Sequence, residues 1–178
     1  EQTQQALLAT ESLYEGSDRI IKAETIEDVL LALLQAPSLA DLDRASLSFF
    51  DEALVEGDVL ESFTRVVSWT RKAGASNAEG LDSTPERFDV KQYPSMLALS
   101  DPYTPAIVYE IETDARLDLA ARKRFVDRLD LHGLMNFPLT AGDLWIGIFT
   151  GLTKAPLMMS DKDLRQISAL IDQAAVVL

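Results

Sequence analysis

The chain has 178 residues, of which 47% are hydrophobic and 25% are charged, the composition of one globular domain able to bury a core. Lysine and arginine total 16 against 29 aspartates and glutamates, and the resulting net charge of −13 disfavours nucleic acid and membrane surfaces as partners. The absence of cysteine excludes disulfides, thiolate metal sites and cysteine nucleophiles, and it fits a cytoplasmic protein.

Neither a signal peptide nor a membrane span is visible. No apolar run approaches the roughly 20 residues needed to cross a bilayer, and the opening Glu-Gln-Thr-Gln-Gln lacks a basic start and an apolar core. The sequence begins without Met and stops at Leu178 within a helical pattern. We therefore expect a piece of a longer protein.

The N-terminal part predicts two helices. Residues 4–22 carry apolar side chains at helical spacing. Thr25 and Asp28 resemble a capping box that starts a second helix, and Pro37 ends it. We interpret residues 1–24 as a linker or a dimerisation helix. Pairing with a partner subunit and packing on its own domain both stay open for this segment.

Two strands and a long loop follow. Residues 44–51 (Arg-Ala-Ser-Leu-Ser-Phe-Phe-Asp) and 62–70 (Ser-Phe-Thr-Arg-Val-Val-Ser-Trp-Thr) predict an antiparallel pair of strands, joined by an acidic loop that contains Gly57. Residues 71–91 are polar and without a clear period, so we expect a loop there. A loop of this length inside a compact domain is usually functional or mobile.

The middle of the chain predicts a short helix over 93–99 and a third strand over 106–111. Thr113 or Asp114 is expected to cap the next helix, which runs to about Asp130.

Residues 133–151 predict a β-hairpin, because two β-rich runs flank the turn at 140–143. The second run, 144–149, is apolar on both faces, so we expect it at the centre of the sheet with other elements above and below. Strict alternation points Leu144, Ile146 and Ile148 to one face and Trp145 and Phe149 to the other.

The last helix, residues 160–178, is expected to begin at Ser160 with Asp163 completing its cap, and to continue into a downstream module. Its apolar residues recur at heptad spacing, which is typical of a coiled coil and equally of a helix docked on its own domain. The candidate dimer-interface residues are Leu7, Tyr14, Ile21, Leu164, Ile167, Ile171, Ala174 and Leu178.

The order of these elements resembles that of a GAF domain, a sensory module with PAS-like architecture. The resemblance covers residues 25–178. The matching segments are Ala45–Asp51, Val66–Trp69, Thr113–Leu117 and the terminal helix, and the strongest match is Phe137–Leu139 followed by Leu144–Ile148.

The resemblance implies an α+β fold: a central antiparallel sheet of five to six strands, with terminal helices on one face and pocket helices and a loop on the other. It also implies a homodimer formed through the terminal helices, a small-molecule ligand and an output module in the same parent chain. Such domains usually precede a histidine kinase, cyclase, phosphodiesterase or transcriptional output.

The sequence excludes part of the chemistry known in this family. Relatives that hold a bilin covalently use cysteine, as do those that reduce free methionine sulfoxide, and this chain has none. Cyclic-nucleotide-binding relatives often carry an Asn-Lys…Phe…Asp-Glu signature. Asn77 has no lysine after it and Phe125 lacks the spacing, so cyclic GMP is disfavoured. The cofactor and the ligand stay unknown.

The implied pocket would be lined by aromatic residues and methionines of the middle segments, at least half of which we expect to be plain core. The candidates are Trp69, Phe88, Tyr93, Met96, Leu97, Tyr109, Phe125, Met135 and Phe137, with Arg87 for charge recognition and His132. Tyr93, Met96 and Tyr109 are favoured because they lie nearest the long loop and the third strand.

His132, the only histidine, is either a haem ligand or hydrogen-bonding group in the pocket, or an exposed residue at a strand start. One histidine without cysteine does not make a zinc site, and a solvated strand edge explains Glu110, Glu112 and Asp114 without a metal. No nucleophile motif and no Gly-rich phosphate loop is present, so we do not expect an enzyme.

Two functional hypotheses follow. The first is a small-molecule-sensing regulatory GAF domain of a multidomain cytoplasmic signalling protein, which passes pocket occupancy to an output module through its terminal helices. The alternative is a ligand-free GAF-like scaffold used for dimerisation. A cavity with polar groups pointing inward would favour sensing, and an interior filled at Tyr93, Met96 and Tyr109 would favour the scaffold.

Overall fold

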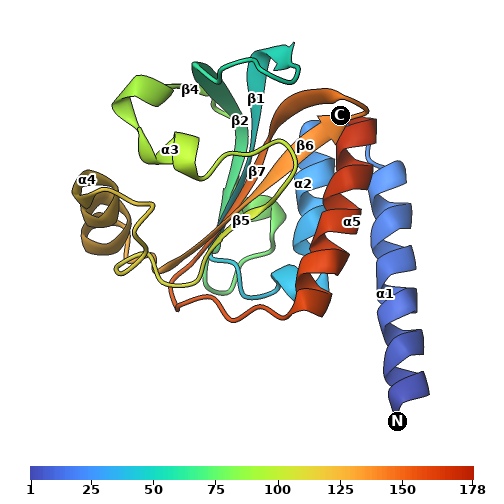
Figure 1. Ribbon diagram of the computed structural model, residues 1–178. Coiled ribbons are helices and arrows are strands. Elements are labelled where there is room, and N and C mark those ends of the chain that lie inside the picture. Colours follow the sequence, from blue (N-terminus) through green and yellow to red (C-terminus); the bar gives the residue numbers. More distant parts are fainter.

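The computed structural model describes residues 1–178 and contains one antiparallel sheet with helices on both sides (Figure 1). The strands are β1 (Arg44–Leu54), β2 (Ser62–Thr70), β3 (Leu81–Asp82), β4 (Glu86–Asp89), β5 (Ala106–Val108), β6 (Gly133–Ala141) and β7 (Leu144–Thr153). Six of them follow the order β3-β2-β1-β7-β6-β5, and β4 pairs with the same edge of β2 as β3 does. The predicted α+β class with a central antiparallel sheet is confirmed.

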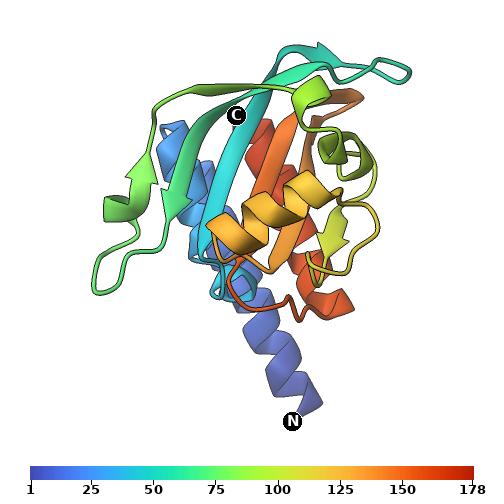
Figure 2. The ribbon, with the colours of Figure 1, turned by 90° about the vertical axis from the view of Figure 1, so that its left-hand side faces the viewer.

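The helices are divided between the two faces of the sheet (Figures 1 and 2). One face carries α1 (Gln2–Ile21), α2 (Ile26–Leu34) and α5 (Asp161–Val177), and the other carries α3 (Ser95–Ala98) and α4 (Leu119–Arg122). A π-helical segment, Lys123–Arg128, extends α4, and 3₁₀ turns lie at Pro37–Leu39, Ala78–Gly80 and Val90–Gln92. None of the helices combines the length and the apolar content that a bilayer span requires.

The stretch predicted as one long loop, residues 71–91, contains β3 and β4. Both strands are short and obtain their backbone partners from the free edge of β2, where Trp69 pairs with Leu81 and Phe63 pairs with Phe88. The rings of Phe63 and Phe88 stack with their centroids 5.1 Å apart. The loop prediction was wrong here because neither strand is long enough to show a period of its own.

β7 lies between β1 and β6, which confirms its predicted central position. Phe149 on β7 pairs with Leu47 on β1 and with Phe137 on β6. All three side chains are fully buried in the larger core, between the sheet and the terminal helices. Burying three such side chains in register stabilises the middle of the sheet by several kcal/mol, at roughly 1.5–3 kcal/mol each.

The predicted alternation along β7 was wrong at one point. Ile148 packs with Trp145 on the face away from the terminal helices, whereas Ile146 packs with Phe149 against the helix-side core. The cause is a β-bulge: the register between β6 and β7 shifts at Ile146, which has no partner residue on β6. The Trp145 indole N–H donates to the carbonyl of Gly147 across the bulge, at 2.9 Å.

α5 is held against its own sheet. Ile167, Ile171 and Ala174 are fully buried in the helix-side core. This corrects their assignment to a dimer interface: the heptad pattern here marks the docked side of an amphipathic helix. The predicted cap is confirmed, because the Asp163 amide donates to Ser160 Oγ at 3.1 Å and the Ser160 amide donates to Asp163 Oδ2 at 2.9 Å.

α1 packs on α5 and α2 with its C-terminal half, while its N-terminal half extends past them (Figure 1). Ile20 is fully buried, and Gly16 faces Leu170 so closely that a Cβ at position 16 would lie 2.9 Å from the end of that side chain. The opposite side of α1 exposes Tyr14 and Ile21. The segment is therefore docked on its own domain, and one apolar stripe is left uncovered.

Candidate ligand-binding site

A hollow of about 450 Å³ lies on the sheet face that carries α3 and α4. Side chains of β1, β2 and β7 form its floor: Arg44, Ser46, Ser48, Arg65, Ser68 and Thr150. Residues from β4 to the π-helical segment border it opposite the floor: Phe88, Tyr93, Met96, Arg124, Phe125 and Leu129. A volume of this size suits a small organic molecule, since ligand pockets span roughly 300–1,000 Å³.

A second hollow of about 550 Å³ adjoins the first between α3 and the α4 region. The two share Tyr93, Met96, Arg124 and Phe125 as a common wall. We take the first hollow as the candidate site because it rests on the sheet, whose paired strands hold the floor side chains in fixed positions.

The floor contains a row of polar residues that crosses the sheet. Asn136 pairs with Thr150, Thr150 with Ser46, Ser46 with Ser68, and Ser68 with Asp82. The Thr150 hydroxyl donates to Asn136 Oδ1 at 2.7 Å. Ser46 and Ser68, in the same row, line the hollow. Polar groups on a sheet face covered by other elements are expensive unless they are satisfied by protein, water or a ligand.

Two arginines of the hollow stack on its aromatic rings. The Arg65 guanidinium lies 5.3 Å from the Phe88 ring centroid and forms an ion pair with Glu86. The Arg124 guanidinium lies 4.4 Å from the ring of Tyr93 and 4.9 Å from that of Phe125. These cation–π contacts hold both guanidinium groups at the aromatic wall of the hollow.

Asp118 positions the segment that carries Arg124 and Phe125. Asp118 caps α4 by accepting from the Ala121 amide at 2.7 Å, and its own amide donates to Ser95 Oγ on α3 at 3.1 Å. The turn then widens into the π-helical segment, a rare conformation that often occurs at functional sites. Asp118 therefore takes the capping role that the sequence assigned to Thr113 or Asp114.

Asp114 organises the preceding loop. It accepts from the Arg116 amide at 2.9 Å and pairs with the Arg116 guanidinium at 2.7 Å. These hydrogen bonds, opposed by partial burial, hold the pKa of Asp114 below its usual value of 3.8. Asp114 thus shapes the loop before α4, and the helix cap itself lies four residues further on, at Asp118.

The structure brings part of the predicted pocket together. Phe88, Tyr93, Met96 and Phe125 come from four different segments and line one hollow. Trp69 borders the hollow but lies in the helix-side core, where it is 3% exposed.

The remaining predicted pocket residues lie elsewhere. Met135 and Phe137 point to the opposite face of the sheet and belong to the helix-side core, because they share one parity on β6. Leu97 and Tyr109 are about half exposed and border neither hollow. Arg87 pairs with Asp51 at 2.6 Å on the exposed edge of the sheet, and this pairing lowers the pKa of Asp51.

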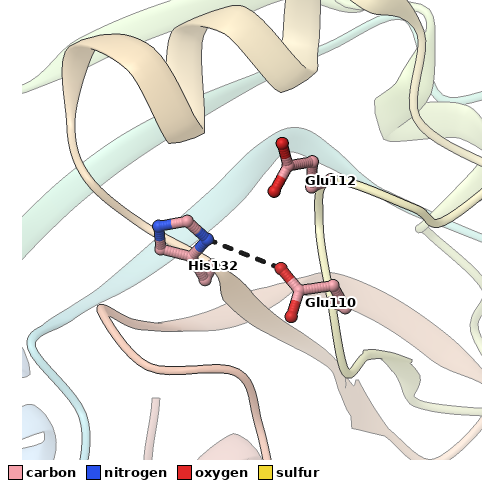
Figure 3. A group of neighbouring side chains, drawn as sticks. All are labelled: Glu110, Glu112 and His132. Atoms are coloured by element: carbon pink, nitrogen blue, oxygen red, sulfur yellow. Dashed lines mark ion pairs between the residues drawn. The ribbon is translucent and has the colours of Figure 1, made fainter.

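His132 also lies outside both hollows, so it is not placed to bind a ligand there. Its Nδ1 lies 3.5 Å from Glu110 Oε1, with Glu112 close by (Figure 3), and its Nε2 lies 3.4 Å from Asp130 Oδ1. Each imidazole nitrogen therefore faces a carboxylate oxygen.

Sequence reasoning missed the floor of the hollow. The signal was present in β1, where Arg44, Ser46 and Ser48 alternate with Ala45 and Leu47. A strand with one polar and one apolar face has the polar face toward water or toward a polar cavity. The predicted pocket residues were mostly aromatic, and these form only the wall opposite the floor.

The comparisons with known proteins agree with this architecture. No protein-family model and no curated protein matches the sequence. Among solved structures, the GAF domain of a two-component sensor histidine kinase from Bacillus halodurans has a TM-score of 0.59 and 19% identity, covering 87% of this chain and 94% of its own.

Two GAF domains from cyanobacterial phytochromes are also similar. The phycocyanobilin-bound domain has a TM-score of 0.65 and 14% identity, covering 94% of this chain and 92% of its own. The phycoerythrobilin-bound domain has a TM-score of 0.65 and 14% identity, and the match covers 97% of this chain and 95% of that domain. This chain therefore has the GAF fold, seen in domains of sensor kinases and phytochromes.

Proposed function

We propose that this chain is the ligand-sensing GAF domain of a larger cytoplasmic signalling protein, regulatory rather than catalytic. Its ligand would occupy the hollow over β1, β2 and β7. The observation that carries the proposal is the hollow of about 450 Å³ with a polar floor and an aromatic wall. The GAF domain of the Bacillus halodurans sensor kinase supports the expectation that an output module lies in the same parent chain.

The sheet would carry the signal. β1 presents Ser46 and Ser48 to the hollow and Ala45 and Leu47 to the core under the terminal helices. Side chains of β7 and β6 belong to the same core, and β6 contacts α5 directly. A ligand that binds one arrangement of floor and wall more tightly would shift the packing of α5 and α1, and its effect would equal its differential affinity for the two arrangements.

The terminal helices would also form a homodimer. The outer side of α1 exposes Leu7, Tyr14 and Ile21, which are 58%, 74% and 69% exposed and recur every seven residues. Pairing with the same stripe of a second copy would remove these apolar side chains from water and so stabilise a dimer. Leu164 on α5 and Leu178 just after it pack partly against the helix-side core, and their exposed parts would lie at the margin of this contact.

Native mass spectrometry of freshly purified protein tests the proposal. We expect extra mass on the folded wild type and none on Ser46→Trp, which fills the hollow. Asn77→Trp, in an exposed loop, serves as the control and should retain the extra mass. A bare dimer from wild type, together with no thermal shift from any compound of a metabolite library, would favour the ligand-free scaffold.

A further inference from the structure

The hollow has an unusual charge for this chain. Its lining contains three arginines, Arg44, Arg65 and Arg124, against two carboxylates, Asp82 and Glu86. The whole chain, in contrast, has a net charge of −13. A local excess of positive charge in an acidic protein attracts anions into that one place while the remaining surface repels them.

Both carboxylates of the hollow are already engaged. Glu86 forms the ion pair with Arg65. Asp82 Oδ1 accepts from the Thr84 amide at 2.8 Å, and the pKa of Asp82 lies below its usual value chiefly because of its hydrogen bonds with Thr84. Glu86 therefore balances Arg65, and Asp82 can balance only one of the two remaining arginines, so the hollow keeps a net positive charge.

Arg44 and Arg124 make no ion pair and no side-chain hydrogen bond within the chain. The Arg124 guanidinium lies against the rings of Tyr93 and Phe125, which contact it without accepting a conventional hydrogen bond from its N–H groups. An arginine carries five N–H donors and no acceptor. Two such side chains lining one hollow present many donors and nothing that accepts.

The floor adds hydroxyl groups. Ser46, Ser48 and Ser68 line the hollow and make no side-chain hydrogen bond within the chain. Hydroxyls donate as well as accept, so the unpartnered groups of the hollow are mostly donors. A ligand that satisfies them must be rich in acceptors, and a charged oxygen group meets this requirement best.

We infer that the hollow takes a small organic anion whose carboxylate or phosphate group binds Arg124 and Arg44, with its apolar or aromatic part against Met96 and Phe125. The inference rests on the proposed function and names the chemical class of its ligand. Guanidinium groups bind both kinds of oxyanion in the same bidentate manner, so carboxylate and phosphate are alternatives within one chemistry.

The test uses NMR of the arginine Nε–H groups in the full chain, titrated with benzoate, with phenyl phosphate and with neutral benzamide. We expect saturable shifts at Arg124 and Arg44 with at least one anion, and much smaller shifts with benzamide. The anion that binds more tightly distinguishes a carboxylate ligand from a phosphate ligand. Arg124→Gln should weaken anion binding by about tenfold to a hundredfold, the range of a charged hydrogen bond.

Arg165→Gln is the matched control, because Arg165 is exposed on α5, makes no ion pair and lies outside the hollow. Its affinity for the anion should equal that of wild type. Equal binding of benzamide and benzoate would overturn the anion inference and leave the pocket in place. Anion binding that Arg124→Gln does not weaken, or the absence of a saturable shift at Arg124 with either anion, would also overturn it. Native mass spectrometry of the wild type tests the sensing function separately, because extra mass on the folded chain would show a bound ligand whatever its charge.

Discussion

Replacing Ile171 with alanine tests whether the apolar stripe of α5 faces its own sheet. The Ile171 side chain is 1% exposed and belongs to a core cluster of 22 buried residues. The substitution removes three carbons, about 2.4 kcal/mol at roughly 0.8 kcal/mol for each. The cavity left behind adds about 1–2 kcal/mol, so the free energy of unfolding should fall by about 3.5–4.5 kcal/mol.

Equilibrium urea denaturation followed by circular dichroism measures this change. Domains have free energies of unfolding on the order of 5–15 kcal/mol, so the variant should still fold. Val176→Ala on the same helix is the control: Val176 is 79% exposed, and its loss should change stability by less than about 0.5 kcal/mol. An Ile171→Ala variant that is as stable as wild type but loses its dimer in sedimentation would place Ile171 between subunits and refute the reasoning.

Two further predictions concern the other end helix and the cap of α5. Tyr14→Asp should weaken dimerisation at least tenfold, as measured by sedimentation equilibrium. Tyr103→Asp is the control and should leave the dimer unchanged, because Tyr103 is 73% exposed, as Tyr14 is at 74%, but lies outside α1. An unchanged dimer in Tyr14→Asp would show that α1 is not part of the interface. Hydrogen bonds from Ser160 hold the pKa of Asp163 below its usual 3.8. The ionised carboxylate therefore stabilises the fold above that pH, and this contribution disappears as the pH falls through the lowered folded-state pKa. Asp163→Asn should cost about 1 kcal/mol at pH 7, and this cost should shrink as the pH falls below 3.8; a cost that stays constant with pH would contradict this account.

Much of the fold could be predicted because its signals are local. The capping pair Thr25–Asp28 and the pair Ser160–Asp163 mark two helix starts within four residues of sequence, and both caps are present. The central position of β7 followed from apolar side chains on both of its faces. Each of these features depends on neighbours a few residues apart.

The candidate site could be predicted only in part. Phe88, Tyr93, Met96 and Phe125 were named as pocket candidates because of their size and position, and they do share one hollow. Nothing in the sequence separated them from Phe137, which has the same chemistry and lies on the other face of the sheet. The separation depends on strand parity, and parity depends on where each strand begins and where it bulges.

The sequence by itself determined the α+β class, the order of the longer helices and strands, the starts of α2 and α5, and the central place of β7, because these follow from periodicity and capping over short distances. Only the tertiary structure decided that Ile171 faces its own sheet, that one bulge reverses the faces along β7, and that Ser46 and Arg124 line one hollow. Residues 78 positions apart meet only when strand pairing and helix packing bring their segments together, and no local pattern encodes that meeting.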